Sequence, residues 1–310
     1  AIRARPGADV KAAQDDSALA AHDLLAHVRN QRIERGMAER VARDVLRGDR
    51  AQAFEQFEQR LATLSLDEPA PLIVWPEAPA PFYPDRPEFH DYISRIARDG
   101  NANFLLGGVA YTKDGAPLNS AFLLDRAGEI QGRYDKIQLV PFGEYIPPAF
   151  SWVNRITGEA GDFRPGERVV TFEADGHRFG VFICYESAFP GLVRQFTNQG
   201  AEFLINLSND GYFGDRAARE QHLDLVRMRA VENHRWILRA TNDGITAMIN
   251  PAGRVTKTIP QHTETSELLR YNYASDQTLY ATWGDWFPWM CLLASVGTVW
   301  KALQRNVDAG

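Results

Sequence analysis

The sequence predicts an α/β fold with mixed sheets, and two patterns in it support that prediction. From residue 68 onward, short apolar runs that end at Gly, Pro or Asn alternate with helical stretches, as buried strands layered with helices do. Around residues 103–134 and 236–258, successive runs follow one another directly, which favours antiparallel hairpins beside parallel strands. A chain of 310 residues that is 45% hydrophobic and 24% charged can bury a large globular core.

The residue patterns divide the chain into three segments, of which the first two carry most of the expected elements. Residues 1–66 form a helical preface. Ala, Leu, Arg, Glu and Gln dominate residues 8–66 and Pro is absent there, so two or three helices are expected, the last over about 50–64. Residues 67–285 form the α/β domain. Its strands are expected at residues 72–75, 103–109, 120–125, 129–134, 169–173, 178–184, 203–207, 236–241 and 246–249, and its helices at 88–98, 190–199 and 217–233.

Residues 286–304 are expected to form an apolar helix. No charged residue occurs from Trp286 to Trp300, and Lys301 and Arg305 follow. The run is shorter than the roughly 20 residues that span a bilayer, so a helix buried in the protein stays open as an alternative. The tryptophans at the edge of the run and the flanking cations favour a helix that anchors the chain at a membrane.

The composition argues against several classes of protein. A net charge of −6 without a basic run disfavours a nucleic-acid-binding protein. The two cysteines, Cys184 and Cys291, lie far apart and have neither the pattern of a disulfide framework nor the spacing of a zinc site. His222 and His234 have no further ligands near them in the sequence, and no glycine-rich stretch makes a phosphate-binding loop, so neither a metal nor a cofactor is expected.

Three reactive side chains each follow an expected strand. Cys184 lies at a strand-to-helix turn, where helix N–H groups favour a nucleophilic thiolate, although a buried structural cysteine is the alternative. Glu77 follows a stiff Pro76 and can act as a general base, unless it is a solvated loop residue. Lys136 can stabilise a developing oxyanion, or it can be an ordinary solvated charge.

The order Glu77, Lys136, Cys184 resembles the nitrilase superfamily, and the surrounding motifs narrow the resemblance. From about residue 70 to residue 300 the chain is similar to the apolipoprotein N-acyltransferase family. The motifs that carry this similarity are VWPE at 74–77, YDK at 134–136, LVPFGEYIP at 139–147, ICYE at 183–186, LSNDGYFG at 207–214, RMRAVEN at 227–233, RATNDGIT at 239–246 and GDW at 284–286.

The resemblance implies both a fold and a reaction. The fold would be a four-layer α-β-β-α sandwich in an enzyme of the bacterial inner membrane, with the catalytic domain on the periplasmic side. The reaction would transfer an acyl chain from a phospholipid to the N-terminal amine of a diacylglyceryl-cysteine lipoprotein. Cys184 would carry the acyl chain as a thioester, Glu77 would act as base and acid, and Lys136 would stabilise the oxyanion, giving ping-pong kinetics without a cofactor.

The resemblance also implies supporting residues at the site. Glu144, Tyr185, Glu186, Asn209 and Tyr212 occupy family positions that support catalysis or bind substrate. The charge of Glu144 suggests that it orients Lys136 or the acceptor amine. The loops that contain Glu144 and Tyr212 also carry aromatic residues. If these are exposed, they would suit a lipid substrate or a membrane surface; if they are packed, they would form an ordinary lid.

Some features depart from the family pattern and leave alternatives open. Several membrane helices that normally come first are absent, residues 1–66 show no strand with the family's Gln-x-Asn motif, and no signal peptide follows Ala1. We therefore expect either a fragment of a membrane enzyme or a trimmed relative. A soluble amidase that uses the same three residues, and a catalytically silent lipid- or lipoprotein-binding module, are the competing functions.

Overall fold

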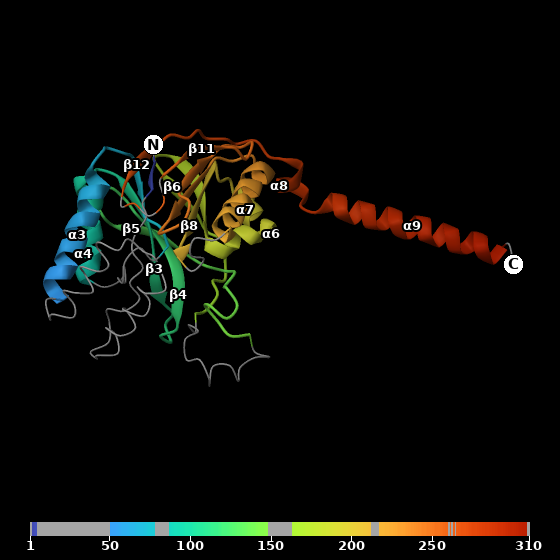
Figure 1. Cartoon of the computed structure of the whole chain (residues 1–310), viewed down its shortest axis with the longest axis horizontal. Helices are drawn as coiled ribbons and strands as arrows, with labels where there is room; N and C mark the ends of the chain where they lie inside the picture. The colour runs from blue at the N-terminus through green and yellow to red at the C-terminus, as the bar shows by residue number, and fades with distance from the viewer. Residues whose placement is uncertain are drawn as a thin grey trace.

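The computed structural model describes residues 2–4, 50–77, 87–147, 163–211, 217–259, 261, 263 and 265–308. Two six-stranded sheets face each other, and helices cover the outer side of each sheet (Figure 1). The four-layer α-β-β-α sandwich expected from the resemblance is therefore confirmed.

The first sheet combines parallel and antiparallel pairs. Its order is β12 (Glu267–Leu269), β1 (Ile2–Ala4), β2 (Leu72–Val74), β3 (Asn103–Tyr111), β4 (Pro117–Leu124) and β5 (Ile130–Asp135). Strands β1, β2 and β3 run parallel, whereas β3, β4 and β5 form an antiparallel meander, as the first predicted hairpin group requires. Helices α3 (Arg50–Leu66) and α4 (Pro87–Asp99) cover its outer face.

Alternating side chains on β2 explain why its sequence is apolar throughout. Leu72 and Val74 join the core between the two sheets, whereas Ile73 and the following Trp75 pack beneath the helices, against residues such as Ile93. A strand that is buried on both faces has no polar side, so its sequence is a continuous apolar run instead of an alternating pattern.

The second sheet has a parallel centre and antiparallel edges. Its order is β11 (Val255–Thr258), β10 (Ala247–Ile249), β9 (Ile237–Thr241), β8 (Phe203–Ser208), β7 (His177–Ile183) and β6 (Thr171–Ala174). Strands β7, β8 and β9 are parallel, and β9, β10 and β11 form the second predicted hairpin group. The outer face packs against α6 (Pro190–Asn198) and α7 (Ala218–Asn233), and the short 3-10 turn η2 (Cys184–Ala188) follows β7.

The nine strands and three helices predicted for the α/β domain are all present, with ends shifted by a few residues. Helix α3 confirms the last helix of the preface; the other helices expected within residues 8–49 lie outside the described residues. The segment 1–66, predicted as a helical preface, also contains a strand that the sequence analysis did not predict, because β1 pairs with β2 and β12. A three-residue strand with Arg3 at its centre has no periodicity to reveal it, and its partners in the sheet create it.

The C-terminal helix α9 (Trp286–Asp308) extends away from the sandwich (Figure 1), beyond the short α8 (Leu279–Trp283). The alternative of a helix buried in the protein is wrong, because Trp289 is 65% exposed and Leu293 is 71% exposed. Within the described part of the chain, no helix combines the length and the hydropathy that crossing a membrane requires.

Candidate active site

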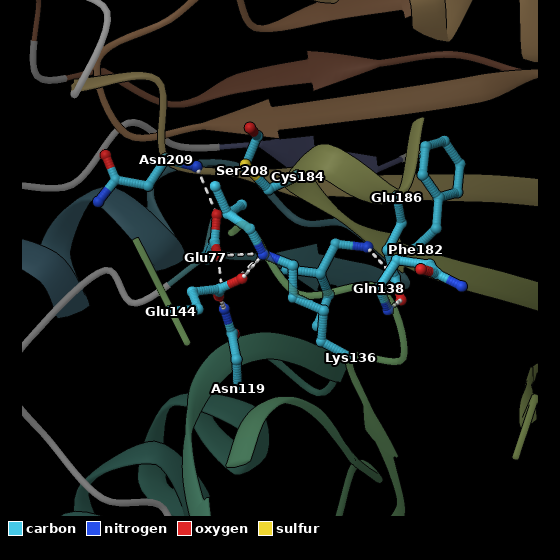
Figure 2. Close-up of polar contacts among 12 residues, drawn as sticks. Glu77, Asn119, Lys136, Gln138, Glu144, Phe182, Cys184, Glu186, Ser208 and Asn209 are labelled. Atoms are coloured by element: carbon cyan, nitrogen blue, oxygen red, sulfur yellow. Dashed lines mark hydrogen bonds and ion pairs between the residues drawn. The ribbon is translucent and has the colours of Figure 1, made fainter. Parts of the chain in front are cut away.

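Three predicted residues from distant parts of the sequence meet where their strands end. Glu77 follows β2, Lys136 follows β5 and Cys184 follows β7, and Figure 2 draws their side chains together between the two sheets. The carboxyl ends of parallel strands meet at one edge of a sheet, and two packed sheets bring two such edges together. The topology therefore brings a carboxylate, an ammonium and a thiol together at one buried position between the sheets.

The Glu77 carboxylate is held from three directions. Its Oε1 accepts hydrogen bonds from Asn119 Nδ2 at 2.7 Å and from Lys136 Nζ at 3.4 Å, and its Oε2 accepts one from the Asn209 backbone N–H at 2.8 Å. The Asn242 side chain also donates to the Glu77 carbonyl at 2.7 Å. Glu77 is only 7% exposed, so the alternative of a solvated loop residue is wrong.

Lys136 is a buried ammonium between two carboxylates. It is 1% exposed, and its Nζ lies 2.9 Å from Glu144 Oε1 and 3.4 Å from Glu77 Oε1. Burial alone would lower the pKa of Lys136, but its neighbours Glu77, Cys184 and Glu144 outweigh burial and raise the pKa above its ordinary value. The side chain is therefore cationic and fixed, and the solvated-charge alternative is wrong.

Cys184 combines an unusual backbone conformation with a protonated thiol. Its φ of 51° lies in the left-handed region, which costs an L-residue about 1–2 kcal/mol. Burial, followed by the Glu77 charge, raises the pKa of the Cys184 thiol to about 12, although Lys136 opposes that shift. Burial therefore opposes the thiolate that the helix N–H groups were expected to favour. Cys184 is the first residue of the short turn η2, and α6 begins farther along the chain at Pro190.

Glu144 and Asn119 complete a ring of polar groups. Asn119 Nδ2 donates to Glu144 Oε1 at 2.6 Å as well as to Glu77, and the Val140 N–H donates to Glu144 Oε2 at 2.8 Å. Glu144 thus contacts Lys136, as its charge suggested. The sequence analysis missed Asn119; its only signal is a carboxamide within a strand whose neighbours are otherwise mostly buried.

Glu186 ties the nucleophile turn to the segment after β5. Its Oε1 accepts from Tyr134 Oη, the Ile137 N–H and the Gln138 N–H at 2.8, 2.7 and 3.2 Å, and its Oε2 accepts from the Ile183 N–H at 2.7 Å. Burial raises the pKa of Glu186 to about 7, against the lowering effect of these donors and of Lys136. Glu186 therefore joins two of the three strand ends.

The other predicted supporting residues have different surroundings. Tyr185 is exposed and packs edge-on against Phe189 with ring centroids 5.2 Å apart. Asn209 contributes its backbone N–H to Glu77, and its side chain accepts the Gly211 N–H at 3.1 Å. Tyr212 lies outside the described residues. Across the described ranges, no cluster of His, Cys, Asp and Glu side chains could hold a metal ion.

A buried thiol beside a fixed base and a fixed cation is an arrangement for covalent catalysis at a carbonyl carbon. The carbon-nitrogen hydrolase family model matches residues 46–279, and the chain belongs to that family. Within it, the sequence is 37% identical over 244 residues to apolipoprotein N-acyltransferase from Geobacter metallireducens, a match that covers 77% of this chain and 47% of the relative. It is 36% identical to the enzyme of the same name from Synechocystis, covering 61% of this chain and 37% of the relative. The chain thus spans about half the length, or less, of these relatives.

Solved structures share the fold at lower sequence identity. An amidase from Nesterenkonia sp. AN1 matches with a TM-score of 0.55 and 18% identity over 86% of this chain and 90% of that one. A glutamine-dependent NAD+ synthetase from Acinetobacter baumannii matches with a TM-score of 0.54 and 17% identity over 89% of this chain and 47% of that one. These likenesses concern the sandwich fold.

Proposed function

We propose that this chain carries the catalytic site of an N-acyltransferase that moves an acyl chain from a phospholipid to the N-terminal amine of a diacylglyceryl-cysteine lipoprotein. The observation that carries the proposal is the buried set Glu77, Lys136 and Cys184, in a chain similar to apolipoprotein N-acyltransferases over most of its length. Small-amide hydrolysis uses the same chemistry, but the similar sequences are acyltransferases.

In the first half-reaction, Glu77 takes the Cys184 proton as the sulfur attacks the ester carbonyl of the phospholipid. The carbonyl π electrons move to oxygen, and the Lys136 ammonium stabilises the resulting oxyanion. The C–O bond then breaks, and the leaving alkoxide takes the proton from Glu77 and departs as a lysophospholipid. The acyl chain remains on sulfur as a thioester.

In the second half-reaction, the amine of the lipoprotein attacks the thioester carbonyl. Glu77 takes a proton from the amine nitrogen, and the C–S bond breaks as the amide forms. The proton on Glu77 then returns to the Cys184 sulfur, so the resting site is restored. Because the first product leaves before the acceptor reacts, the kinetics are ping-pong.

The supporting residues fit this scheme in distinct ways. Glu144 keeps Lys136 in place and cationic, as their 2.9 Å contact supports. Glu186 holds the nucleophile turn against the Lys136 segment, and the Asn209 N–H orients Glu77. Tyr185, exposed beside the nucleophile, contacts substrate, and we assign the same role to Tyr212 from its place in the family motif alone.

The substrates place this site at a membrane surface. Phe142 on the Glu144 loop is 54% exposed, and the exposed face of α9 carries Trp289, Leu293 and Trp300. Aromatic and aliphatic side chains of this kind partition into the lipid interface. We place the protein at the bacterial inner membrane with its catalytic domain on the periplasmic side, as the family resemblance implies.

Intact-mass spectrometry after incubation with phospholipid vesicles tests the proposal. The parent chain and Cys291→Ser are expected to gain the mass of one acyl chain, which neutral hydroxylamine removes, whereas Cys184→Ser gains none. Cys291 lies exposed on α9 and serves as the matched cysteine control.

The other outcomes identify the alternatives. A folded parent without an adduct would contradict acyl transfer by this chain. Release of ammonia from small amides would then favour an amidase. Vesicle or lipoprotein binding without any turnover would favour a silent binding module.

A further inference from the structure

A second group of buried polar side chains contacts the turn η2, which begins at Cys184. Asp210 follows β8, His222 comes from α7 and Arg239 comes from β9, and all three are buried. None of them takes part in the reaction proposed above. Burying two charged groups and an imidazole is costly unless they are paired, so their arrangement requires a reason.

His222 bonds directly to the backbone of the nucleophile. Its Nε2 lies 3.0 Å from the Cys184 carbonyl oxygen, and its Nδ1 lies 2.9 Å from Asp210 Oδ1. A carbonyl oxygen can only accept a hydrogen bond, so Nε2 carries a proton and donates it. The imidazole therefore fixes the peptide plane that follows the Cys184 Cα.

Asp210 anchors the imidazole from the other side. Its Oδ1 accepts from Ser208 Oγ at 2.8 Å, and its Oδ2 accepts from the Arg239 guanidinium. Burial would raise the pKa of Asp210, but Arg239 and His222 outweigh it and hold the pKa below its ordinary value. A Cβ on Gly244 would lie 2.2 Å from Asp210 Oδ2, so a residue without a side chain packs against this carboxylate.

The same segment of the chain also contacts Glu77, the proposed general base. Asn209, which directly precedes Asp210, donates its N–H to Glu77 Oε2 at 2.8 Å. One end of the network thus bonds the nucleophile residue and the other end bonds the general base. Cys184 needs such support, because its left-handed backbone conformation is strained.

We propose that His222, anchored by Asp210 and Arg239, is a positioning residue that fixes the Cys184 thiol relative to the Glu77 carboxylate. The inference rests on the roles given to Cys184 and Glu77 in the proposed function. It predicts that the thiol depends on Glu77 for its reactivity only while the His222 bond to the Cys184 carbonyl is intact.

Labelling with iodoacetamide, followed peptide by peptide with mass spectrometry, tests this coupling without any lipid substrate. The measured quantity is the ratio of the Cys184 labelling rates with and without the Glu77→Gln substitution. That ratio is determined in the parent, His222→Asn and His222→Gln chains. Exposed Cys291 provides the internal reference rate in every sample. His234→Asn, at the exposed end of the same helix, is the matched control.

The parent is expected to be labelled on the order of tenfold or more faster than its Glu77→Gln variant. The Glu77 charge raises the Cys184 pKa, but a general base that takes the thiol proton as the sulfur attacks outweighs that effect. This ratio falls to within about twofold in His222→Asn. The shorter amide cannot reach the Cys184 carbonyl, and without that hydrogen bond the thiol is no longer coupled to Glu77. His222→Gln, whose amide nitrogen reaches the position of Nε2, and His234→Asn keep the ratio of the parent. If His222→Asn does not fold, Asp210→Asn replaces it and is expected to lower the ratio.

An unchanged ratio in the folded His222→Asn chain would overturn the inference, and so would equal loss in His222→Gln. A parent without any Glu77 dependence would overturn both the base assignment and the inference. A third outcome separates the two proposals. If labelling depends on Glu77 and His222 as expected but the chain forms no acyl adduct, the proposed function is contradicted and the positioning role of His222 is retained.

Discussion

The substitution Glu186→Gln should change how the stability of this protein depends on pH. Glu186 is fully buried, and its two carboxylate oxygens accept four hydrogen bonds from residues on both sides of the site. A glutamine amide offers one acceptor oxygen instead of two. If that oxygen faces the three donors around Tyr134, its NH2 group faces the Ile183 N–H, and that buried donor loses its partner at a cost of about 1–3 kcal/mol.

The pH dependence follows from the raised pKa of the carboxyl group. Burial raises the pKa of Glu186 to about 7 from 4.5. The folded pKa is the higher one, so the stability contributed by this group is fully present below about pH 4.5 and is lost as the pH rises through 7. The gap between the two values corresponds to about 3 kcal/mol, most of which lies between pH 5 and pH 8.

Urea unfolding of the parent and Glu186→Gln at pH 5 and pH 8 measures the effect. The variant should be about 1–3 kcal/mol less stable than the parent at pH 5, and this difference should be about 2–3 kcal/mol smaller at pH 8. Glu173→Gln, on an exposed position of β6, should change the free energy of unfolding by no more than about 0.5 kcal/mol at either pH. A Glu186→Gln penalty that is the same at both pH values would refute the reasoning.

Three further perturbations test separate parts of the structure. Asn119→Ala removes the 2.7 Å donor to Glu77 and should slow Cys184 labelling by about tenfold, the equivalent of one hydrogen bond; an unchanged rate would contradict the orienting role of Asn119. Gly166→Ala would place a Cβ 2.1 Å from the Asp135 carbonyl oxygen and should lower the free energy of unfolding by about 1–3 kcal/mol in urea titrations; an unchanged free energy would contradict the steric conflict. Removing α9 should abolish co-sedimentation with anionic vesicles while leaving thermal unfolding of the sandwich unchanged; sedimentation that persists would place the membrane contact elsewhere.

Local signals in the sequence were sufficient for most of the fold. Continuous apolar runs such as 179–183 are fully buried, and they stand out because no polar side chain interrupts them. The strands β1 and β12 were not predictable in this way. Each has three residues, Arg3 and Glu267 are among them, and each exists because a neighbouring strand offers it unpaired backbone groups.

The three central residues of the candidate site were predictable from the sequence, whereas the protonation of Cys184 was not. Glu77, Lys136 and Cys184 each end a strand, and that local feature indicated them. The protonation of Cys184 depends instead on burial and on the Glu77 charge, which come from the packing of one sheet on the other. Asn119 and His222 were missed for the same reason, because their partners lie far away in the sequence.

The resting charges explain why the site contains a second carboxylate. Glu77 and Glu144 together outweigh the charge of Lys136, and Cys184 is neutral. In the proposed reaction the thiol proton moves to Glu77, so Lys136 loses one anionic partner at the moment when sulfur and then the carbonyl oxygen become negative. Glu144, 2.9 Å from Nζ, keeps Lys136 cationic and in place throughout. The ammonium is therefore oriented before charge develops on the substrate, which is the condition under which a buried cation stabilises a transition state more than a ground state.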